Sequence, residues 1–200
     1  MAMSSTGRSG RRRGETQTRD AIAFAARAAF ADVGYDRATM RSIAAAAGVD
    51  PALIVHFFGS KEGLFREVTA LPPEMGAAMA GLADGPRQEV GLRFAQAVVG
   101  MLENPATRPV ILARLRSAAS HPEAAALVRE LVSRDLGLLT SSLTDDRPEA
   151  RAVLAGTQVV GLAFVRYVVR VEPLASMDAA AVVDVLAPTF QRILVGPLTD

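Results

Sequence analysis

The chain has no cysteine and no tryptophan, and its 200 residues include two histidines and two tyrosines. Without cysteine it can form no disulfide and offer no thiolate to a metal, which is typical of proteins in a reducing compartment. The two histidines, His56 and His121, lie far apart in the sequence. A histidine-rich metal site or a histidine-based triad is therefore not expected. We predict neither a metal nor a cofactor.

Sequence motifs of common enzymes are also missing. The chain contains no G-x-S-x-G, no G-x-x-x-x-G-K and no G-x-G-x-x-G. Its carboxylates are scattered at polar turns and helix starts, where solvation or the helix dipole accounts for them. We therefore predict that the protein is not an enzyme.

Long apolar segments are scarce. The longest run, 152–165, stops at Arg166. It is shorter than the ~18 to 20 residues that a membrane span requires. The N-terminus is polar and rich in arginine, without the apolar stretch of a signal peptide. We expect a soluble protein located in the cytoplasm.

Charge is distributed unevenly along the chain. The net charge is +1, but residues 1–67 hold ten Arg or Lys against seven Asp or Glu, and the remainder holds twelve against fourteen. A basic front suits a nucleic-acid partner at that end. Residues 1–14, rich in arginine, serine and glycine, are predicted to be a disordered tail. Two readings of the tail stay open: a solvated segment, or a basic arm that adds affinity for DNA.

The most informative stretch is 39–66. Apolar residues share one face of a short helix: Met40, Ile43, Ala44 and Ala47. Thr39 stands before that helix as a cap and Gly48 ends it. Asp50, followed by a proline, begins a second helix over 51–57, and Ser60 caps a third. Two short helices joined by a tight glycine turn indicate a helix-turn-helix, whose second helix enters the major groove.

This stretch resembles the DNA-binding domain of tetracycline-repressor-type (TetR) transcriptional regulators, whose signature begins T-x-x-x-I-A-x-x-A-G-V. The matching positions are Thr39, Ile43, Ala44, Ala47, Gly48, Val49, Ile54, Phe58, Ser60, Lys61 and Leu64. Matches at fixed spacing over two helices and the start of a third are a specific signal. The resemblance implies an all-α protein with an N-terminal reading domain and a C-terminal domain for effector binding and dimerisation.

Polar contacts to DNA are expected from four residues. Thr39 would give a hydroxyl and a backbone N–H to phosphate, and Arg41 would grip a guanine edge. His56 is expected to contact phosphate or sugar, and Lys61 to anchor phosphate.

The second helix should bury Ile54 with Phe58, four residues apart. Its outward face would then carry Pro51, Ala52, Leu53 and Val55 beside His56. Val55 stands where the family offers a tyrosine, and Phe57 where it offers histidine or tyrosine. We therefore expect less grip on the DNA backbone from this helix than the family pattern implies.

Beyond a break at 71–73, proline and glycine divide the chain into helices. No alternation with a period of two appears over a useful length, so no sheet is predicted. The expected divisions are a tail at 1–14, a helix-turn-helix domain at 15–70 and an effector-binding and dimerisation domain at 71–200.

The last two helices, 149–171 and 178–195, are apolar nearly all round. Surface helices are not, so a second subunit is expected to cover them in a homodimer. On the first of the two, the residues expected to face the domain interior are Val153, Val160, Phe164 and Val168.

A hydrophobic effector would need a cavity in the C-terminal domain. The candidates for its lining are Met79, Phe94, Val98, Met101, Leu115, Leu139, Gln158, Phe164 and Tyr167. Met75 is a further apolar candidate, and Arg166 a further polar one. The alternative is an intact core without a cavity. The function expected overall is a ligand-responsive repressor on a palindromic operator. The alternative is a dimeric helical small-molecule-binding protein with weak or lost DNA binding.

Overall fold

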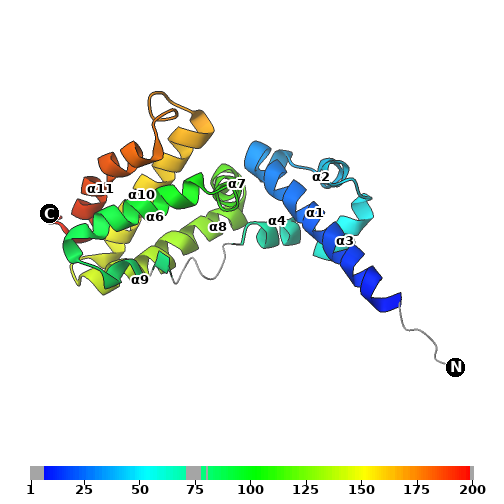
Figure 1. The fold of residues 1–200 in the computed structure, drawn as a ribbon, viewed down its shortest axis with the longest axis horizontal. Coiled ribbons are helices and arrows are strands. Elements are labelled where there is room, and N and C mark those ends of the chain that lie inside the picture. The colour runs from blue at the N-terminus through cyan, green and yellow to red at the C-terminus, as the bar shows by residue number, and fades with distance from the viewer. Residues whose placement is uncertain (1–6, 71–77, 80, 199–200) are drawn as a thin grey trace.

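The computed structural model describes residues 7–70, 78–79 and 81–198, and these residues form helices and connecting turns without a strand. The prediction of an all-α protein is confirmed for them. The molecule is elongated, with four N-terminal helices at one end and a larger helical bundle at the other (Figure 1).

The N-terminal end, here called the reading head, consists of α1 (Gly7–Arg37), α2 (Met40–Ala47), α3 (Pro51–Phe58) and α4 (Lys61–Val68). The helix α1 begins at Gly7, inside the segment 1–14 that was predicted to be a disordered tail. The part of the tail at 7–14 is therefore helical rather than disordered, and residues 1–6 lie outside the described residues. The regular part of α1 ends at Gly34, whose φ of 78° suits a residue without a side chain.

The core of the reading head is built from the apolar stripe of α1. Ile22, Ala26 and Phe30 are fully buried, and the Phe30 ring meets Phe65 of α4 edge-on at 5.0 Å between centroids. Ala113 and Ala124 from the second half of the chain belong to the same cluster. The reading head therefore packs directly on the helices that follow it.

The second half of the chain contains α6 (Val90–Glu103), α7 (Arg108–Ala118), α8 (Pro122–Glu130), α9 (Gly137–Leu143), α10 (Pro148–Ala163) and α11 (Ala179–Val195). Two π-helical turns, η3 (Leu131–Leu136) and η4 (Phe164–Val169), extend α8 and α10, and two 3₁₀ turns, η1 (Gly81–Asp84) and η2 (Arg87–Glu89), precede α6. Prolines stand at the first positions of α8 and α10, so α10 begins one residue before the expected 149. The break at 71–73 lies outside the described residues.

Close contact between α6 and α11 holds the bundle together. The rings of Phe94 and Phe190 meet at 4.7 Å between centroids. A Cβ on Gly91 would lie 2.4 Å from the backbone nitrogen of Gln191, so the two helices touch backbone to backbone there. The side chain of Gln191 accepts from the Gly91 N–H at 2.8 Å and donates to the Arg87 carbonyl at 2.9 Å.

The face that α10 turns inward differs from the one expected. Its small residues Ala152 and Ala155 are buried, whereas Val153 and Phe164 are 52% and 43% exposed. Val160 and Val168 are half-buried. The placement of Val153 and Phe164 in the interior was therefore wrong.

The reason is the closeness of η3 to α10. A Cβ on Gly156 would lie 2.8 Å from Cγ2 of Val132, so only small residues fit on the side of α10 that faces η3. The larger apolar side chains are left on the outer side.

Two arginines also point inward from this helix. Arg151, 2% exposed, donates to the carbonyls of Asp146 at 2.7 Å, Ile193 at 2.7 Å and Gly196 at 3.0 Å. It thereby satisfies carbonyls at the end of α11 that the helix leaves without partners.

Arg166 in η4 is part of a second buried network. It donates to Glu103 Oε1 at 3.0 Å and to the Tyr167 hydroxyl at 3.0 Å, and that hydroxyl donates to Glu103 Oε1 at 2.7 Å. Tyr167 and Arg166 therefore already have partners within the chain.

The continuous helix of α10 and η4, Pro148–Val169, is long and apolar enough to span a membrane by length and composition, with a mean hydropathy of 1.7 over an 18-residue stretch. It is longer than the run at 152–165 read from the sequence. Core helices of soluble proteins have the same properties. Its inward arginines bind protein groups, as described above, so the helix is fitted to the rest of this chain on one side.

Candidate nucleic-acid interface

The turn between α2 and α3 is set by local capping. Gly48 ends α2 in the left-handed conformation, with φ 66° and ψ 34°, and the Asp50 carboxylate accepts from the Ala52 N–H at 2.7 Å to begin α3. The two helices bend by 103° at this turn. That angle lies within the range of a helix-turn-helix, so the predicted motif forms.

Buried side chains fix the orientation of α3. Ile54 is fully buried and Phe58 is 8% exposed, as the four-residue spacing predicted. Val55, between them, is 54% exposed, and Leu53 is 37% exposed. The outward face of α3 therefore presents the expected residues: Pro51, Ala52, Leu53, Val55 and His56.

The N-terminus of α2 carries a capping box that the sequence reading missed. Thr39 Oγ1 accepts from the Ser42 N–H at 3.0 Å, and Ser42 Oγ accepts from the Thr39 N–H at 3.1 Å. The Thr39 groups expected to meet phosphate are thus already hydrogen-bonded within the turn. The N–H groups of Met40 and Arg41, in the first helical turn, are the donors that an α-helix leaves open to an anion. The spacing of Thr39 and Ser42, T-x-x-S, could have indicated this capping box.

Arg41 and Lys61 differ in how they are held. Arg41 is exposed on α2. Lys61 is half-buried, with Nζ 3.5 Å from the Asp36 carbonyl oxygen and 4.3 Å from the centroid of the Tyr35 ring. A cation over an aromatic face is attracted to it, so Lys61 is positioned at the edge of the head.

The local field is less positive than the net charge of the head suggests. The pKa of the Glu62 carboxyl, in the first turn of α4, lies below its usual value because it accepts from its own backbone N–H. Glu62 is therefore ionised beside Lys61, and Asp50 adds a second carboxylate at the start of α3. Both oppose the approach of a polyanion.

The reading head is tied to α7 and α8. The Tyr35 N–H donates to Ser117 Oγ at 2.9 Å, and the Tyr35 ring lies 3.7 Å from the His121 ring, centroid to centroid. Arg66 of α4 pairs with Glu123 of α8 at 3.1 Å. Burial raises the pKa of the Tyr35 hydroxyl. Movement of α7 or α8 would therefore act directly on the head.

Most residues proposed for an effector cavity are core residues. Phe94, Val98 and Leu139 are fully buried, and Met79 is 7% exposed. Met101, Leu115 and Tyr167 are half-buried against the same core, and Phe164 faces outward. Met75 lies outside the described residues. Among the described residues, the buried and half-buried side chains of this set pack against one another in the core of the second half of the chain.

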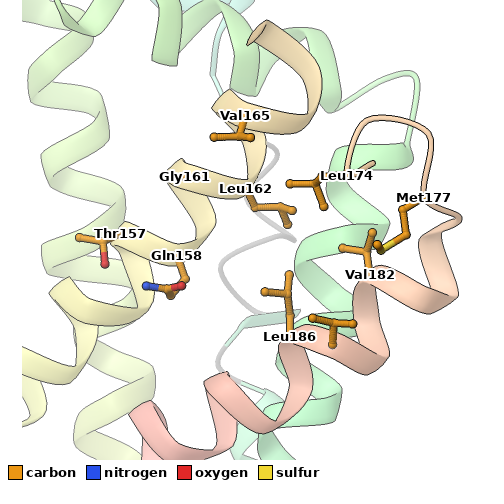
Figure 2. Close-up of a pocket in the computed structure, with 10 residues that line it drawn as sticks. Thr157, Gln158, Gly161, Leu162, Val165, Leu174, Met177, Val182 and Leu186 are labelled. Carbon is orange, nitrogen blue, oxygen red and sulfur yellow. The ribbon is translucent and has the colours of Figure 1, made fainter. Parts of the chain in front are cut away.

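A groove does open between α10 and α11, with a volume of about 450 Å³. One of the residues expected to line an effector cavity, Gln158, lines this groove. Figure 2 shows Thr157, Gln158 and Val165 on one side and Leu174, Met177, Val182 and Leu186 on the other. The lining is mostly apolar and continues the outer side of α10 and α11, where Val185 is 65% exposed.

The fold and this site define a helix-turn-helix protein with a helical second domain. Residues 22–68 match the family model for bacterial regulatory proteins of the tetR family, and residues 88–194 match the model for the tetracyclin repressor-like C-terminal domain. The chain belongs to the tetR family.

Known relatives agree with this assignment. A TetR-family regulator from Streptomyces coelicolor A3 is 34% identical, with a TM-score of 0.55 over 90% of this chain and 96% of that one. NalD of Pseudomonas aeruginosa, the secondary repressor of the MexAB-OprM multidrug efflux pump, shares the fold at 20% identity, with a TM-score of 0.66 over 90% of this chain and 98% of its own.

A curated relative is matched over a shorter stretch. The HTH-type transcriptional repressor AcnR of Corynebacterium glutamicum is 40% identical over 90 residues, which are 45% of this chain and 43% of that protein. The match therefore spans less than half the length of this relative.

Proposed function

We propose that the protein is a DNA-binding transcriptional regulator, a repressor that binds a palindromic operator as a homodimer in the cytoplasm. The observation that carries this proposal is the 103° turn between α2 and α3, beyond which one face of α3 is exposed. A short helix presented in this way fits the major groove.

The roles of the DNA-facing residues follow from their chemistry. Arg41 reads a guanine edge with two hydrogen bonds, and Lys61 and His56 contact the backbone. Thr39 holds the first turn of α2 so that its N–H groups face phosphate. The short and apolar side chains of α3 read shape or thymine methyl groups: Pro51, Ala52, Leu53 and Val55.

The dimer is formed by the outer faces of α10 and α11. Val153, Leu154 and Phe164 on α10 and η4, and Val185 on α11, are all more than 40% exposed. A contiguous apolar face of this kind marks an interface. A second copy would cover the groove beside Gln158 as well, at the ordinary scale of ~800 Å² per partner.

The chain is accordingly divided into a DNA-binding domain at 15–70 and an effector-binding and dimerisation domain at 71–200. An effector would act by favouring a spacing of the two heads that does not match successive major grooves, ~34 to 36 Å apart. No catalytic role is assigned.

Binding to DNA at two salt concentrations tests the proposal. Bound DNA is first selected from a random pool and read for a palindrome, and the full chain is then titrated with that duplex and with a scrambled one. We expect a specificity ratio of ~10³ or more that survives the change in salt. An affinity equal for both duplexes, and lost as salt rises, would favour the alternative of a small-molecule-binding protein with weak or lost DNA binding.

A further inference from the structure

Arg114 of α7 is buried, and no hydrogen bond joins it to any of the residues that the structure describes. It is 8% exposed, and its Nε is inaccessible to solvent and makes no hydrogen bond. Arg151 and Arg166 are similarly buried, but each donates to several oxygens. A buried guanidinium without hydrogen bonds costs free energy, because the group loses its hydration and no protein acceptor replaces the lost water.

Burial lowers the pKa of Arg114, and the carboxylates of Glu130 and Asp135 act against this shift. Arginine nevertheless keeps its proton in proteins at neutral pH. The chain therefore holds a charged group that lines an open space and finds no acceptor at hydrogen-bond distance among the residues described.

That space is a pocket of about 210 Å³ between α4, α8 and η3. Arg66 and Ala70 line it from the reading head, and Leu127 and Leu131 supply apolar walls. A water molecule occupies roughly 30 Å³ in the liquid. The pocket is therefore large enough for a small organic molecule and too small for a peptide or nucleotide.

The other charges around the pocket are already paired. Arg134 bonds both Glu130 and Asp135, the latter at 2.9 Å between Nε and Oδ1, and Arg66 bonds Glu123. Arg114 is the lining cation that remains once these pairs of described residues are counted.

Backbone geometry marks the same place. Arg134 and Asp135 belong to η3, a π-helical turn in an otherwise regular helix from 122 to 143. Such turns are less stable than the α-helix and occur frequently at functional sites. The widened turn places this charged pair on the wall of the pocket.

We infer that this pocket binds a small organic monocarboxylate, whose carboxylate accepts from Arg114 and whose carbon body lies against Leu127 and Leu131. A carboxylate matches the two-pronged donor geometry of a guanidinium. The nearby carboxylates of Glu130 and Asp135 disfavour a doubly charged phosphate. The site differs from the groove between α10 and α11 in its position, its charge and its ligand.

Occupancy would couple to the reading head. The pocket joins α4, which carries Arg66, to η3 in the second half of the chain. A carboxylate bound there adds a bridge across this junction and biases the position of the head. This consequence, unlike the binding itself, rests on the proposed function.

Calorimetric titration of the full chain with benzoate and with 3-methylbutanoate, at constant ionic strength set by sodium chloride, tests the site. We expect saturable binding of at least one of them and weaker binding of inorganic phosphate. R114M should lose affinity by about 10- to 100-fold, since a charge-assisted hydrogen bond is removed. R129M, which changes an exposed arginine of α8 outside the pocket, should bind as the wild type does.

Thermal unfolding separates a binding role from a structural one. Without carboxylate, R114M should unfold at the same temperature as the wild type or higher, because the unpaired buried charge is gone. A lower unfolding temperature, undiminished affinity in R114M, or no binding of either carboxylate by the wild type would overturn the inference. R114K, which keeps the charge without the fork, should bind more weakly than the wild type and serves if R114M does not fold.

Operator affinity with and without the carboxylate distinguishes the two proposals. A shift in the wild type that is absent in R114M supports the coupling, and an unchanged affinity despite binding overturns the coupling. A chain that binds the carboxylate but no DNA refutes the proposed function and leaves the pocket assigned. A chain that binds an operator but no carboxylate supports the proposed function and refutes the assignment of the pocket.

Discussion

The two ends of the molecule expose different chemistry. The reading head turns outward the short side chains of α3 with Arg41 and His56, whereas the outer side of α10 and α11 exposes valine, leucine and phenylalanine. Both ends keep a complete core beneath these surfaces. The difference fits the proposed function, in which one surface meets the polyanion DNA and the other meets a second copy of the chain. Substitutions on one surface should therefore leave the other surface unchanged.

Introducing a charge into the apolar end should have the largest effect. V185D places a carboxylate on a residue that is 65% exposed, so the monomer should fold, but the dimer would bury an unpaired charge. Separation of the two heads should lower operator affinity by ~10² to 10⁴-fold. Light scattering and titration with the operator measure the two effects.

L138D is the matched control, because Leu138 of α9 is also 65% exposed. It should remain dimeric and bind DNA. Dissociation of both variants, or of neither, would contradict the assignment of the interface to α10 and α11.

Removing Arg151 should lower the stability of the helical bundle at the apolar end. R151M leaves three backbone carbonyls without their charged donor, including two at the end of α11. We expect a loss of roughly 3 kcal/mol in the free energy of unfolding, measured by urea denaturation. The control R129M should change the free energy of unfolding little. An unchanged midpoint in R151M would show that solvent replaces the arginine at these carbonyls.

At the other end, R41A should relax sequence specificity. Loss of a bidentate contact to guanine costs ~1 to 3 kcal/mol at one base step and little elsewhere. K61A should instead weaken binding to all sequences similarly, since a phosphate contact carries no sequence information. Titration with a set of single-base operator variants separates the two patterns, and a uniform loss in R41A would rule out its assigned role.

The smallest effect concerns pH. Hydrogen bonds from the Tyr167 hydroxyl and Arg166 hold the pKa of Glu103 below its usual value. The stability that this contributes is present above the unfolded pKa of ~4.3 and is lost as the pH falls through the lower folded pKa. Denaturation from pH 6 to pH 3 should therefore show a steeper loss in the wild type than in E103Q. E149Q, at an exposed site on α10, should keep the slope of the wild type.

Local signals in the sequence were sufficient for the helix-turn-helix. Thr39, Gly48, Asp50 and Ser60 each act on residues within one turn, so their roles as caps could be predicted without knowing the rest of the fold. The family motif added the function.

The inward face of α10 could not be predicted in this way. Valine and phenylalanine are more apolar than alanine, yet the approach of Val132 to Gly156 decided which side of the helix is buried. Likewise, the local sequence does not indicate that Arg114 is buried and Arg129 is exposed, because both arginines follow apolar residues in short helices. Such features depend on contacts between distant segments.

Backbone contact between α6 and α11 limits how a signal can cross this molecule. Gly91 packs against the backbone of Gln191, whose side chain also bonds Gly91 and Arg87, so α6 and α11 cannot slide or rotate past each other without breaking these contacts. They form a stator. A conformational change that reaches the reading head must then come from movement of α7 and α8, which contact the head, relative to this rigid pair.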